Sequence, residues 1–230
     1  MFEKIINFID TFFHMKRIFI FLNHKKIDII FDIGSHKGEF LESFLKLKSI
    51  TKIFCFEPQI KIFKILINNF SNVKNPKIIF TNCAIGQQNI NRKIYTNILS
   101  STSSLKKINN SSIFYKIKKI LLCQKSIIKD SYPTKIRKLD RFLKNIPLSK
   151  HTILVKIDTE GSEFEVLIGM KKNINKIKYI LIEKQFFSQY KNVDFNKSHA
   201  FLIKNNFKLK KKFIFPLLNF EDRLYSNLSL

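Results

Sequence analysis

The stretch Ile29-Ile30-Phe31-Asp32-Ile33-Gly34-Ser35-His36-Lys37-Gly38 decides the fold of this chain. It begins as a short apolar run, rich in β-branched and aromatic side chains, which is typical of a buried parallel strand. The run ends at two glycines four residues apart, and residues 39–48 then carry apolar side chains at helical spacing. A strand, a glycine turn and a helix form a ligand site at the carboxyl end of a strand in open α/β sheets. Asp32, just before the turn, is therefore the first candidate to contact a ligand.

Strand and helix patterns alternate along the rest of the chain. Strands are predicted over 52–56, 77–82, 152–158 and 179–183, with helices over 58–70, 162–170 and 194–205, and two terminal strands over 207–215 and 224–230. Ser162 and Glu165 have the spacing of a capping box at the start of one of these helices. This alternation indicates an α/β fold with a mostly parallel sheet.

The alternation is interrupted between about residues 87 and 135, which we interpret as an insertion. This stretch carries a hairpin-arm pattern at 92–96, a Ser/Thr run at 100–104 and a basic helical pattern at 111–129. Long connections of this kind often carry specificity. Two interpretations stay open: a lid over the substrate, and a solvated basic helix with a flexible loop.

Composition sets limits on the class of protein. With 230 residues, 45% of them hydrophobic and 26% charged, the chain fits one globular domain, which we assign to residues 28–230. The net charge of +25 has two explanations: a basic surface for nucleic acid, an anionic glycan or a membrane, or a compositional bias toward residues with AT-rich codons. The charge alone therefore does not identify a partner.

Three widely spaced cysteines, Cys55, Cys83 and Cys123, argue against a disulfide framework or a zinc site and favour a reducing cytoplasm.

The N-terminal segment, residues 1–27, is rich in Phe and Ile. Asp10, His14, Lys16 and Arg17 interrupt it well short of the ~20 apolar residues that a membrane span needs. It also lacks the charge order and cleavage site of a signal peptide. We expect an amphipathic helix packed on the domain, with a membrane-surface anchor as the alternative, and a soluble protein without a transmembrane segment.

Acidic residues end four of the predicted parallel strands: Asp32, Glu57, Asp158 and Glu183. The carboxyl ends of such strands form the ligand-binding edge of an open α/β sheet. Glu57 follows Gly34 by 23 residues (57 − 34), close to the offset at which an acidic side chain binds ribose hydroxyls. The alternative for each carboxylate is to cap the helix that follows it.

The glycine turn narrows the choice of nucleotide. Gly34-x-x-x-Gly38 is neither a G-x-G-x-x-G turn nor a P-loop, which disfavours a pyrophosphate cofactor. An adenosine ligand without phosphates, bound by Asp32 and Glu57, indicates S-adenosylmethionine.

Lys156 and Asp158 lie two residues apart on a predicted strand, so their side chains share one face. A lysine in an apolar strand needs a partner, and Asp158 is the nearest. The pair is either catalytic, with Asp158 as general base, or a structural ion pair. Glu160 and Glu163 extend this group, but their spacing does not require a divalent ion, and no metal site is predicted. We expect His36 to face solvent.

Four motifs resemble the FkbM family of methyltransferases. They are Phe31-Asp32-Ile33-Gly34-Ser35-His36-Lys37-Gly38, Phe56-Glu57-Pro58, Asn82-Cys83-Ala84-Ile85-Gly86, and Lys156-Ile157-Asp158-Thr159-Glu160-Gly161-Ser162-Glu163 with the trailing Val166-Leu167-x-Gly169. Weaker matches are Ser103-Ser104-Leu105 and Lys138-Leu139-Asp140. The resemblance covers roughly residues 28–185.

The resemblance implies a class I, Rossmann-like methyltransferase that uses S-adenosylmethionine, with a seven-stranded, mostly parallel sheet whose last strand is antiparallel. Understood members methylate hydroxyl groups of sugars and other small-molecule scaffolds. The implied cofactor-binding residues are Asp32, Gly34, Ser35, Gly38, Glu57 and Ala84, and the candidate catalytic residues are Asp158, Lys156, Glu160 and Glu163. The chain departs from the family at Ser35-His36, where Ala-Asn is usual, and at Lys184, where His is frequent. The second departure makes Asp158 the stronger candidate for the general base.

The sequence therefore predicts an O-methyltransferase for a hydroxyl of a small-molecule or glycan acceptor. One alternative is an RNA methyltransferase that uses the basic insertion, although no RNA-binding module or platform of stacking aromatic residues is recognisable. A second alternative is a non-catalytic Rossmann-like scaffold whose acidic residues only cap helices. The RNA methyltransferase alternative predicts RNA binding that weakens with salt, and the scaffold alternative predicts that S-adenosylmethionine does not bind.

Overall fold

The computed structural model describes residues 10–98, 100–109, 112, 115–116, 127–144, 146–147, 150–187, 190–216 and 220–230. Its main feature is a seven-stranded sheet in the order β3-β2-β1-β7-β8-β10-β9. The strands are β1 (Ile29–Ile33), β2 (Lys52–Phe56), β3 (Lys77–Thr81), β7 (Ile153–Ile157), β8 (Tyr179–Gln185), β9 (Phe207–Ile214) and β10 (Phe220–Asn227). Only the last strand, β10, runs antiparallel to its neighbours β8 and β9. The predicted fold class is confirmed.

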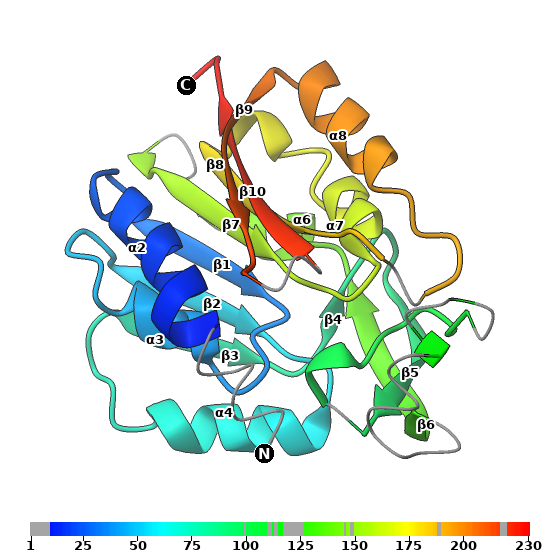
Figure 1. The fold of residues 1–230 in the computed structure, drawn as a ribbon. Coiled ribbons are helices and arrows are strands. Elements are labelled where there is room, and N and C mark those ends of the chain that lie inside the picture. The colour runs from blue at the N-terminus through cyan, green and yellow to red at the C-terminus, as the bar shows by residue number, and fades with distance from the viewer. Residues whose placement is uncertain are drawn as a thin grey trace.

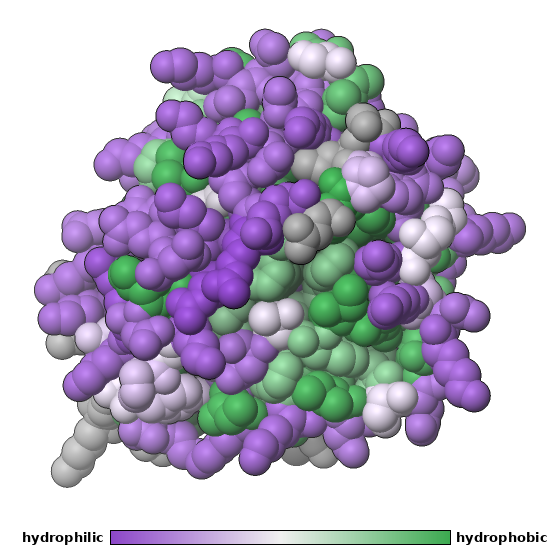
Figure 2. All heavy atoms as spheres, turned by 180° about the vertical axis from the view of Figure 1, so that it is seen from behind, coloured by the Kyte–Doolittle hydropathy of each residue, from purple (hydrophilic) through white to green (hydrophobic). Residues whose placement is uncertain are grey.

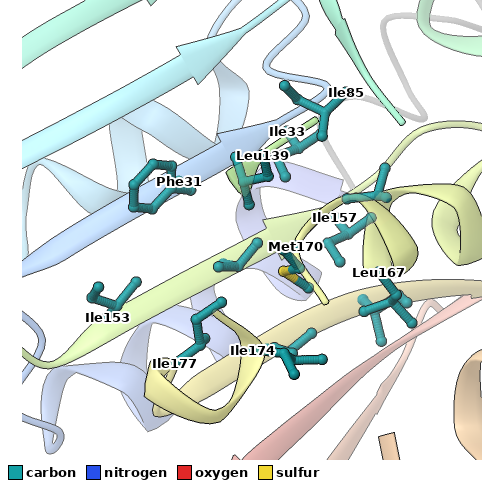
Figure 3. Packing of buried hydrophobic residues seen from close by; sticks show 14 of the residues in the cluster. Phe31, Ile33, Ile85, Leu139, Ile153, Ile157, Leu167, Met170, Ile174 and Ile177 are labelled. Atoms are coloured by element: carbon teal, nitrogen blue, oxygen red, sulfur yellow. The ribbon is translucent and has the colours of Figure 1, made fainter. Parts of the chain in front are cut away.

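Helices cover both faces of this sheet and make three layers (Figure 1). One face packs against α2 (Lys16–Asn23), α3 (Glu39–Phe44) and α4 (Ile60–Phe70), and the other against α6 (Asp140–Leu143), α7 (Glu163–Gly169) and α8 (Phe195–Lys204). Figure 3 shows the second of these cores, a cluster that includes Phe31 and Ile33 of β1, Ile153 and Ile157 of β7, and Leu167 of α7. Because side chains alternate across a strand, neighbouring residues of β1 enter opposite cores.

The insertion forms a small sheet of its own, in the order β4-β6-β5. Its strands are β4 (Ala84–Ile85), β5 (Ile90–Asn97) and β6 (Ile128–Arg137), and a short 3₁₀ turn, η2, spans Ser100–Thr102. The predicted hairpin arm is confirmed, because β5 pairs antiparallel with β6. Most of the helix predicted over 111–129 lies outside the described residues, and its last two residues belong to β6 instead.

The N-terminal segment is described from Asp10 onward. A π-helical turn, η1 (Asp10–Met15), leads into α2, whose Ile18 and Leu22 are buried against the sheet. His14 is fully buried and its Nε2 lies 2.7 Å from a carboxylate oxygen of Asp222 on β10. Among the described residues, no helix combines the length and the apolarity needed to cross a membrane.

Several boundaries differ from the prediction. The helix after the glycine turn ends at Phe44, and β10 begins at Phe220, four residues before the predicted start. The capping box of Ser162 and Glu165 is wrong: Ser162 is the N-cap of α7 but its side chain makes no capping hydrogen bond. The Glu165 carboxylate instead pairs with Lys106 of the insertion.

Seen from behind, the surface is mostly hydrophilic, with hydrophobic residues gathered in one area near the centre and lower right (Figure 2).

Candidate active site

The carboxyl ends of β1, β2, β7 and β8 bring the predicted acidic residues to one edge of the sheet. β1 lies between β2 and β7, and β8 follows β7, with every pair parallel. Asp32 is in register with Lys156 of β7. Because register partners on neighbouring strands point to the same face, the two side chains meet.

The glycine turn is fixed to the strands on both sides of it. The amides of Gly34 and Ser35 donate to the carbonyl of Phe56 at 3.0 and 3.1 Å. Gly34 has a φ of +83°, and a Cβ atom there would lie 1.8 Å from the carbonyl oxygen of Asp158. The turn therefore needs glycine at this position, since it packs directly on the loop that follows β7. Gly38, with a φ of +99°, ends the turn as the N-cap of α3.

Ser35 has a structural contact in this turn. Its hydroxyl donates to the backbone carbonyl of Asp32 at 2.8 Å and accepts from the amide of Phe56 at 3.2 Å. The side chain is 3% exposed. Ser35 thus connects β1 and β2 below the turn.

Glu57 ends β2 and is buried, with 3% of its surface exposed. Its two carboxylate oxygens accept hydrogen bonds from the amides of His36 (3.0 Å) and Gln59 (2.8 Å). Burial raises the pKa of Glu57 to about 7, although the amides of Gln59 and His36 act in the opposite direction. The carboxylate therefore joins the glycine turn to the start of α4. Asn82 supports the same strand end by donating to the carbonyl of Glu57 at 2.8 Å.

Lys156 lies in a buried pocket between two carboxylates. Its Nζ is 3.1 Å from Oδ2 of Asp158, 3.6 Å from Oδ1 of Asp32 and 4.4 Å from the ring centroid of Phe40. Burial alone would lower the pKa of Lys156, but the carboxylates of Asp158 and Asp32 outweigh burial and the net shift is upward. Lys156 is thus an ammonium ion at neutral pH and is not available as a base.

Asp32 is fully buried, and neither of its carboxylate oxygens has a hydrogen-bond partner among the described residues. Burial raises its pKa, an effect that Lys156 only partly opposes. The structure therefore places Asp32 beneath the turn and against Lys156, whereas Asp158 is partly exposed, with 28% of its side-chain surface accessible.

Three carboxylates gather on the other side of Asp158. One oxygen atom from each of Asp158, Glu160 and Glu183 lies within 4.8 Å of the others, which is also the type of ligand set that divalent ions accept. The side-chain amide of Gln185 donates to Glu160 (2.6 Å) and to Glu183 (3.2 Å). Burial raises the pKa of Glu183 well above its ordinary value, and the nearby carboxylates, Asp158 first, raise it further.

The sequence groups Glu163 with Asp158 and Glu160, whereas in the structure its carboxylate contacts the backbone of its own loop. Its Oε1 accepts from the amides of Thr159 (3.3 Å) and Gly161 (2.9 Å) and from the Thr159 hydroxyl (3.2 Å). Glu163 thereby closes the loop between β7 and α7 on itself. Glu160, within that loop, has a φ of +53°, which is uncommon for a residue other than glycine.

A cleft with a volume of about 220 Å³ opens beside these carboxylates. Its described lining consists of Glu163, Glu183, Gln185, Phe186, Val193 and Phe195. The cleft lies where β8 ends and the chain turns toward α8. It thus continues the site away from the glycine turn.

His36 differs from the sequence prediction, and Ala84 lies where the chain joins the small sheet. His36 does not face solvent: its ring nitrogens lie 2.8 Å from Glu39 Oε1 and 2.8 Å from Ser100 Oγ of the insertion. Ala84, in β4, is buried and pairs with Ile136 of the small sheet. Both residues thus connect the predicted cofactor side to the insertion.

The sequence prediction missed Ser100 and Gln185. Ser100 contacts both His36 and Gln59, the residues whose amides donate to Glu57. Its hydroxyl oxygen lies 2.8 Å from the His36 ring, and its carbonyl accepts from the Gln59 side chain at 3.0 Å. Ser104, at the other end of the Ser/Thr run, donates to the carbonyl of Glu160 at 2.6 Å. The run thus spans from the glycine turn to the acidic loop. Gln185 was detectable, since it follows Glu183 by two residues on the same strand.

The comparisons with known proteins agree on one family and one fold. The model of the family described as methyltransferase FkbM domain matches residues 32–209. A solved methyltransferase FkbM from Methylobacillus flagellatus shares 15% identity and a TM-score of 0.57, over 87% of this chain and 44% of that one. This chain therefore spans less than half of the length of that protein. No curated protein matches the sequence.

Other solved structures of the same fold include RNA-modifying enzymes. TrmK from M. capricolum, solved with S-adenosylhomocysteine, has 13% identity and a TM-score of 0.52, over 94% of this chain and 67% of that one. Sp1610 from Streptococcus pneumoniae, described as a putative tRNA (m1A22) methyltransferase in complex with S-adenosylmethionine, has 8% identity and a TM-score of 0.51, over 94% and 72%. At these identities the likeness shows the fold.

Proposed function

The chain belongs to the FkbM family of methyltransferase domains, and from this premise we propose that it transfers a methyl group from S-adenosylmethionine to a hydroxyl of a sugar, glycan or related small-molecule acceptor. The observation that carries the proposal is the division of the site into two ends. The glycine turn and Glu57 form one end, and the carboxylates around Asp158 form the other, with Lys156 between them.

The cofactor end fits an adenosine group. Each oxygen of Glu57 accepts one backbone hydrogen bond and keeps a second lone pair, so the carboxylate can accept from both hydroxyls of a ribose. Gly34 and Gly38 adopt the positive φ values that form the turn, and the turn lies next to Glu57. We therefore propose that Gly34, Ser35, Gly38, Glu57 and Ala84 form the cofactor site. Asp32, which is fully buried, would act on that site through Lys156.

The acceptor end fits a hydroxyl nucleophile. The sulfonium of the bound cofactor supplies an already electrophilic methyl group, so positioning the acceptor oxygen provides much of the rate, and a general base adds roughly 10²–10⁴-fold. Asp158 is the proposed base, and Lys156 holds its carboxylate at 3.1 Å. Glu160 and Glu163 complete this end, the first by facing the acceptor and the second by fixing the loop.

Calorimetric titration of S-adenosylmethionine and S-adenosylhomocysteine tests the cofactor end. We expect micromolar binding to the wild-type protein and a loss of at least about 100-fold in Glu57→Ala, since two hydroxyl-to-carboxylate hydrogen bonds are removed. Glu42→Ala, an exposed acidic residue on α3, is the matched control and should bind like the wild type. A well-folded wild-type protein that binds neither compound would favour the scaffold alternative.

Transfer of a labelled methyl group tests the acceptor end. Cell extract is incubated with the enzyme and radiolabelled S-adenosylmethionine, and the product is then treated with ribonuclease or oxidised with periodate. Label in a ribonuclease-resistant carbohydrate fraction supports the proposal. Asp158→Asn should bind the cofactor within a few-fold of wild type and transfer methyl groups at least about 100 times more slowly.

The RNA methyltransferase alternative is favoured by one observation, the net charge of +25. It predicts tight RNA binding that falls steeply with salt concentration and label that ribonuclease removes. The ribonuclease treatment above tests the second expectation, and RNA binding measured at increasing salt concentration tests the first.

A further inference from the structure

The turn η1 and the helix α2 have a buried side and an exposed side. Toward the sheet, Ile18 and Leu22 are each 1% exposed and belong to the core. On the side away from the sheet, Phe13 and Ile20 are each 51% exposed. Single exposed apolar residues are common, but two on one side of a short segment leave a continuous apolar surface in water. We call this side the outer face; its exposed residues are Phe13, Lys16, Arg17 and Ile20.

Cations lie between the two apolar side chains of the outer face. Lys16 and Arg17 are both exposed, and Lys25 and Lys26 follow α2. Residues 11–27 contain no acidic residue. Large apolar side chains together with lysine and arginine are typical of segments that lie in the headgroup region of a membrane.

The outer face adjoins the edge strand β9. The guanidinium of Arg17 donates to the carbonyl of Ile214 at 3.2 Å. The ring centroids of Phe21 and Phe213 lie 5.8 Å apart. The helix therefore lies along the end of β9, and the two elements present one surface.

The strand β9 adds positive charge to this surface. It contains no acidic residue and exposes Lys208, Lys210, Lys211 and Lys212. In the register with β10, Lys208 and Lys211 lie on the same face of the sheet as Phe213, which is the face that α2 covers. Clusters of four or more cations beside an amphipathic helix are attracted to anionic lipids, by about 1 kcal/mol for each cation near the lipid surface.

The acidic residues of the neighbouring strand do not neutralise this charge at the surface. Glu221 and Asp222 of β10 are 3% and 2% exposed. Asp222 lies 2.7 Å from Nε2 of His14, and Glu221 lies 2.6 Å from the guanidinium of Arg223. Both carboxylates therefore have partners inside the protein.

We propose that the outer face, continued by β9, binds an anionic membrane surface. Phe13 and Ile20 enter the boundary between headgroups and acyl chains, and the cations contact the lipid phosphates. The exposed apolar pair favours a lipid surface over RNA, because phosphate contacts on RNA need cations but give no reason for exposed apolar side chains between them. This inference goes beyond the proposed function and does not depend on it.

The outer face begins beside the acceptor end of the site. Phe13 precedes His14, which contacts Asp222, and Asp222 is the register partner of Glu183. Binding at the outer face would therefore hold the acceptor end close to the lipid surface.

Co-sedimentation of the full chain with lipid vesicles tests the proposal. The vesicles consist of phosphatidylcholine alone or with about 30% phosphatidylglycerol, and we expect at least about tenfold stronger binding to the anionic vesicles. A chain with a net charge of +25 is attracted to any anionic surface, so the comparison of matched variants decides the result. Circular dichroism verifies that each variant is folded.

The first pair of variants tests the apolar residues. Phe13→Ser with Ile20→Ser should weaken binding to the anionic vesicles at least about tenfold. Phe187→Ser with Ile203→Ser removes the same two residue types elsewhere on the surface, where they are 64% and 49% exposed, and should bind like the wild type.

The second pair tests the cations. Lys16→Gln with Lys211→Gln should weaken binding at least about tenfold, whereas Lys171→Gln with Lys172→Gln, an equal loss of charge at exposed residues after α7, should change it less than about threefold. Equal binding to neutral and anionic vesicles, or equal effects within either pair, would overturn the inference. Variants of the outer face that weaken RNA binding but leave vesicle binding unchanged would overturn it too, and would assign this surface to RNA.

Discussion

Replacing Lys156 with methionine should strongly destabilise the protein. The side chain is 2% exposed, and its ammonium lies 3.6 Å from Asp32 and 3.1 Å from Asp158. At an effective dielectric constant of about 20, each contact is worth about 5 kcal/mol before the cost of dehydrating the charges is subtracted. Methionine keeps most of the volume and removes the charge. Asp32 would then be buried without its counter-charge and, within the described residues, without a hydrogen bond.

Removing one member of a buried ion pair typically costs about 3–5 kcal/mol, and we expect a loss in this range for Lys156→Met. The assay is urea unfolding at pH 7, followed by circular dichroism. Lys46→Met is the matched control, because Lys46 is exposed and its Nζ lies 3.9 Å from the Glu42 carboxylate. In this variant the free energy of unfolding of the protein should change by less than about 0.5 kcal/mol.

A double variant tests whether the loss comes from the stranded charge. Asp32→Asn removes the carboxylate charge, so Asp32→Asn with Lys156→Met should be at least about 2 kcal/mol more stable than the sum of the two single variants predicts. Additive losses, or a loss of less than about 1 kcal/mol in Lys156→Met, would refute the argument that Lys156 neutralises Asp32.

Three further predictions concern the glycine turn. Since the pKa of Glu57 is about 7 in the folded protein and 4.5 in the unfolded chain, the folded state binds more protons between these values, and stability falls as pH rises from about 4.5 to 7. Between pH 5 and pH 8 this difference in pKa corresponds to about 2.5 kcal/mol, so Glu57→Gln should reduce the fall in the free energy of unfolding, measured by urea unfolding, by that amount in the cofactor-free protein. Gly34→Ala should cost at least about 3 kcal/mol, read as a lower Tm, because its Cβ would overlap the carbonyl of Asp158. His36→Ala removes the hydrogen bond to Ser100 and should speed hydrogen exchange of residues 100–104 about tenfold, measured by mass spectrometry, while exchange in β1 stays unchanged.

The fold and the acidic residues at the ligand-binding edge of the sheet could be predicted from the sequence, because both depend on local patterns. Apolar runs of five residues that end at acidic groups fix which strands are parallel and where they end, so Asp32, Glu57, Asp158 and Glu183 could be placed at one edge. Contacts across the insertion could not be predicted this way. The bond between His36 and Ser100 joins residues 64 positions apart, and no periodic pattern specifies such a pair.

The sequence also could not separate the buried members of the site from the exposed ones. Asp32 and Asp158 both follow apolar strand residues, yet Asp32 is fully buried and Asp158 partly exposed. The difference arises because Asp32 lies within β1, one residue before the end of the strand, whereas Asp158 lies beyond the end of β7 and belongs to the loop. The same limit applies to Glu163, whose carboxylate turns back to the amides of its own loop.

Lys156 shows why the structural and catalytic interpretations of the strand-end pair are not alternatives. Its ammonium has to stay charged, because Asp32 on its inner side has no other partner in the described part of the chain and Asp158 on its outer side lies 3.1 Å away. The ion that stabilises the strand ends therefore also holds the proposed base in one orientation, next to the carbonyl of Gly34. A substitution of Lys156 would thus change both stability and methyl transfer, whereas Asp158→Asn leaves Lys156 paired with Asp32 and should reduce transfer with a smaller loss of stability. The ratio of the two effects in these variants distinguishes a positioning residue from a base.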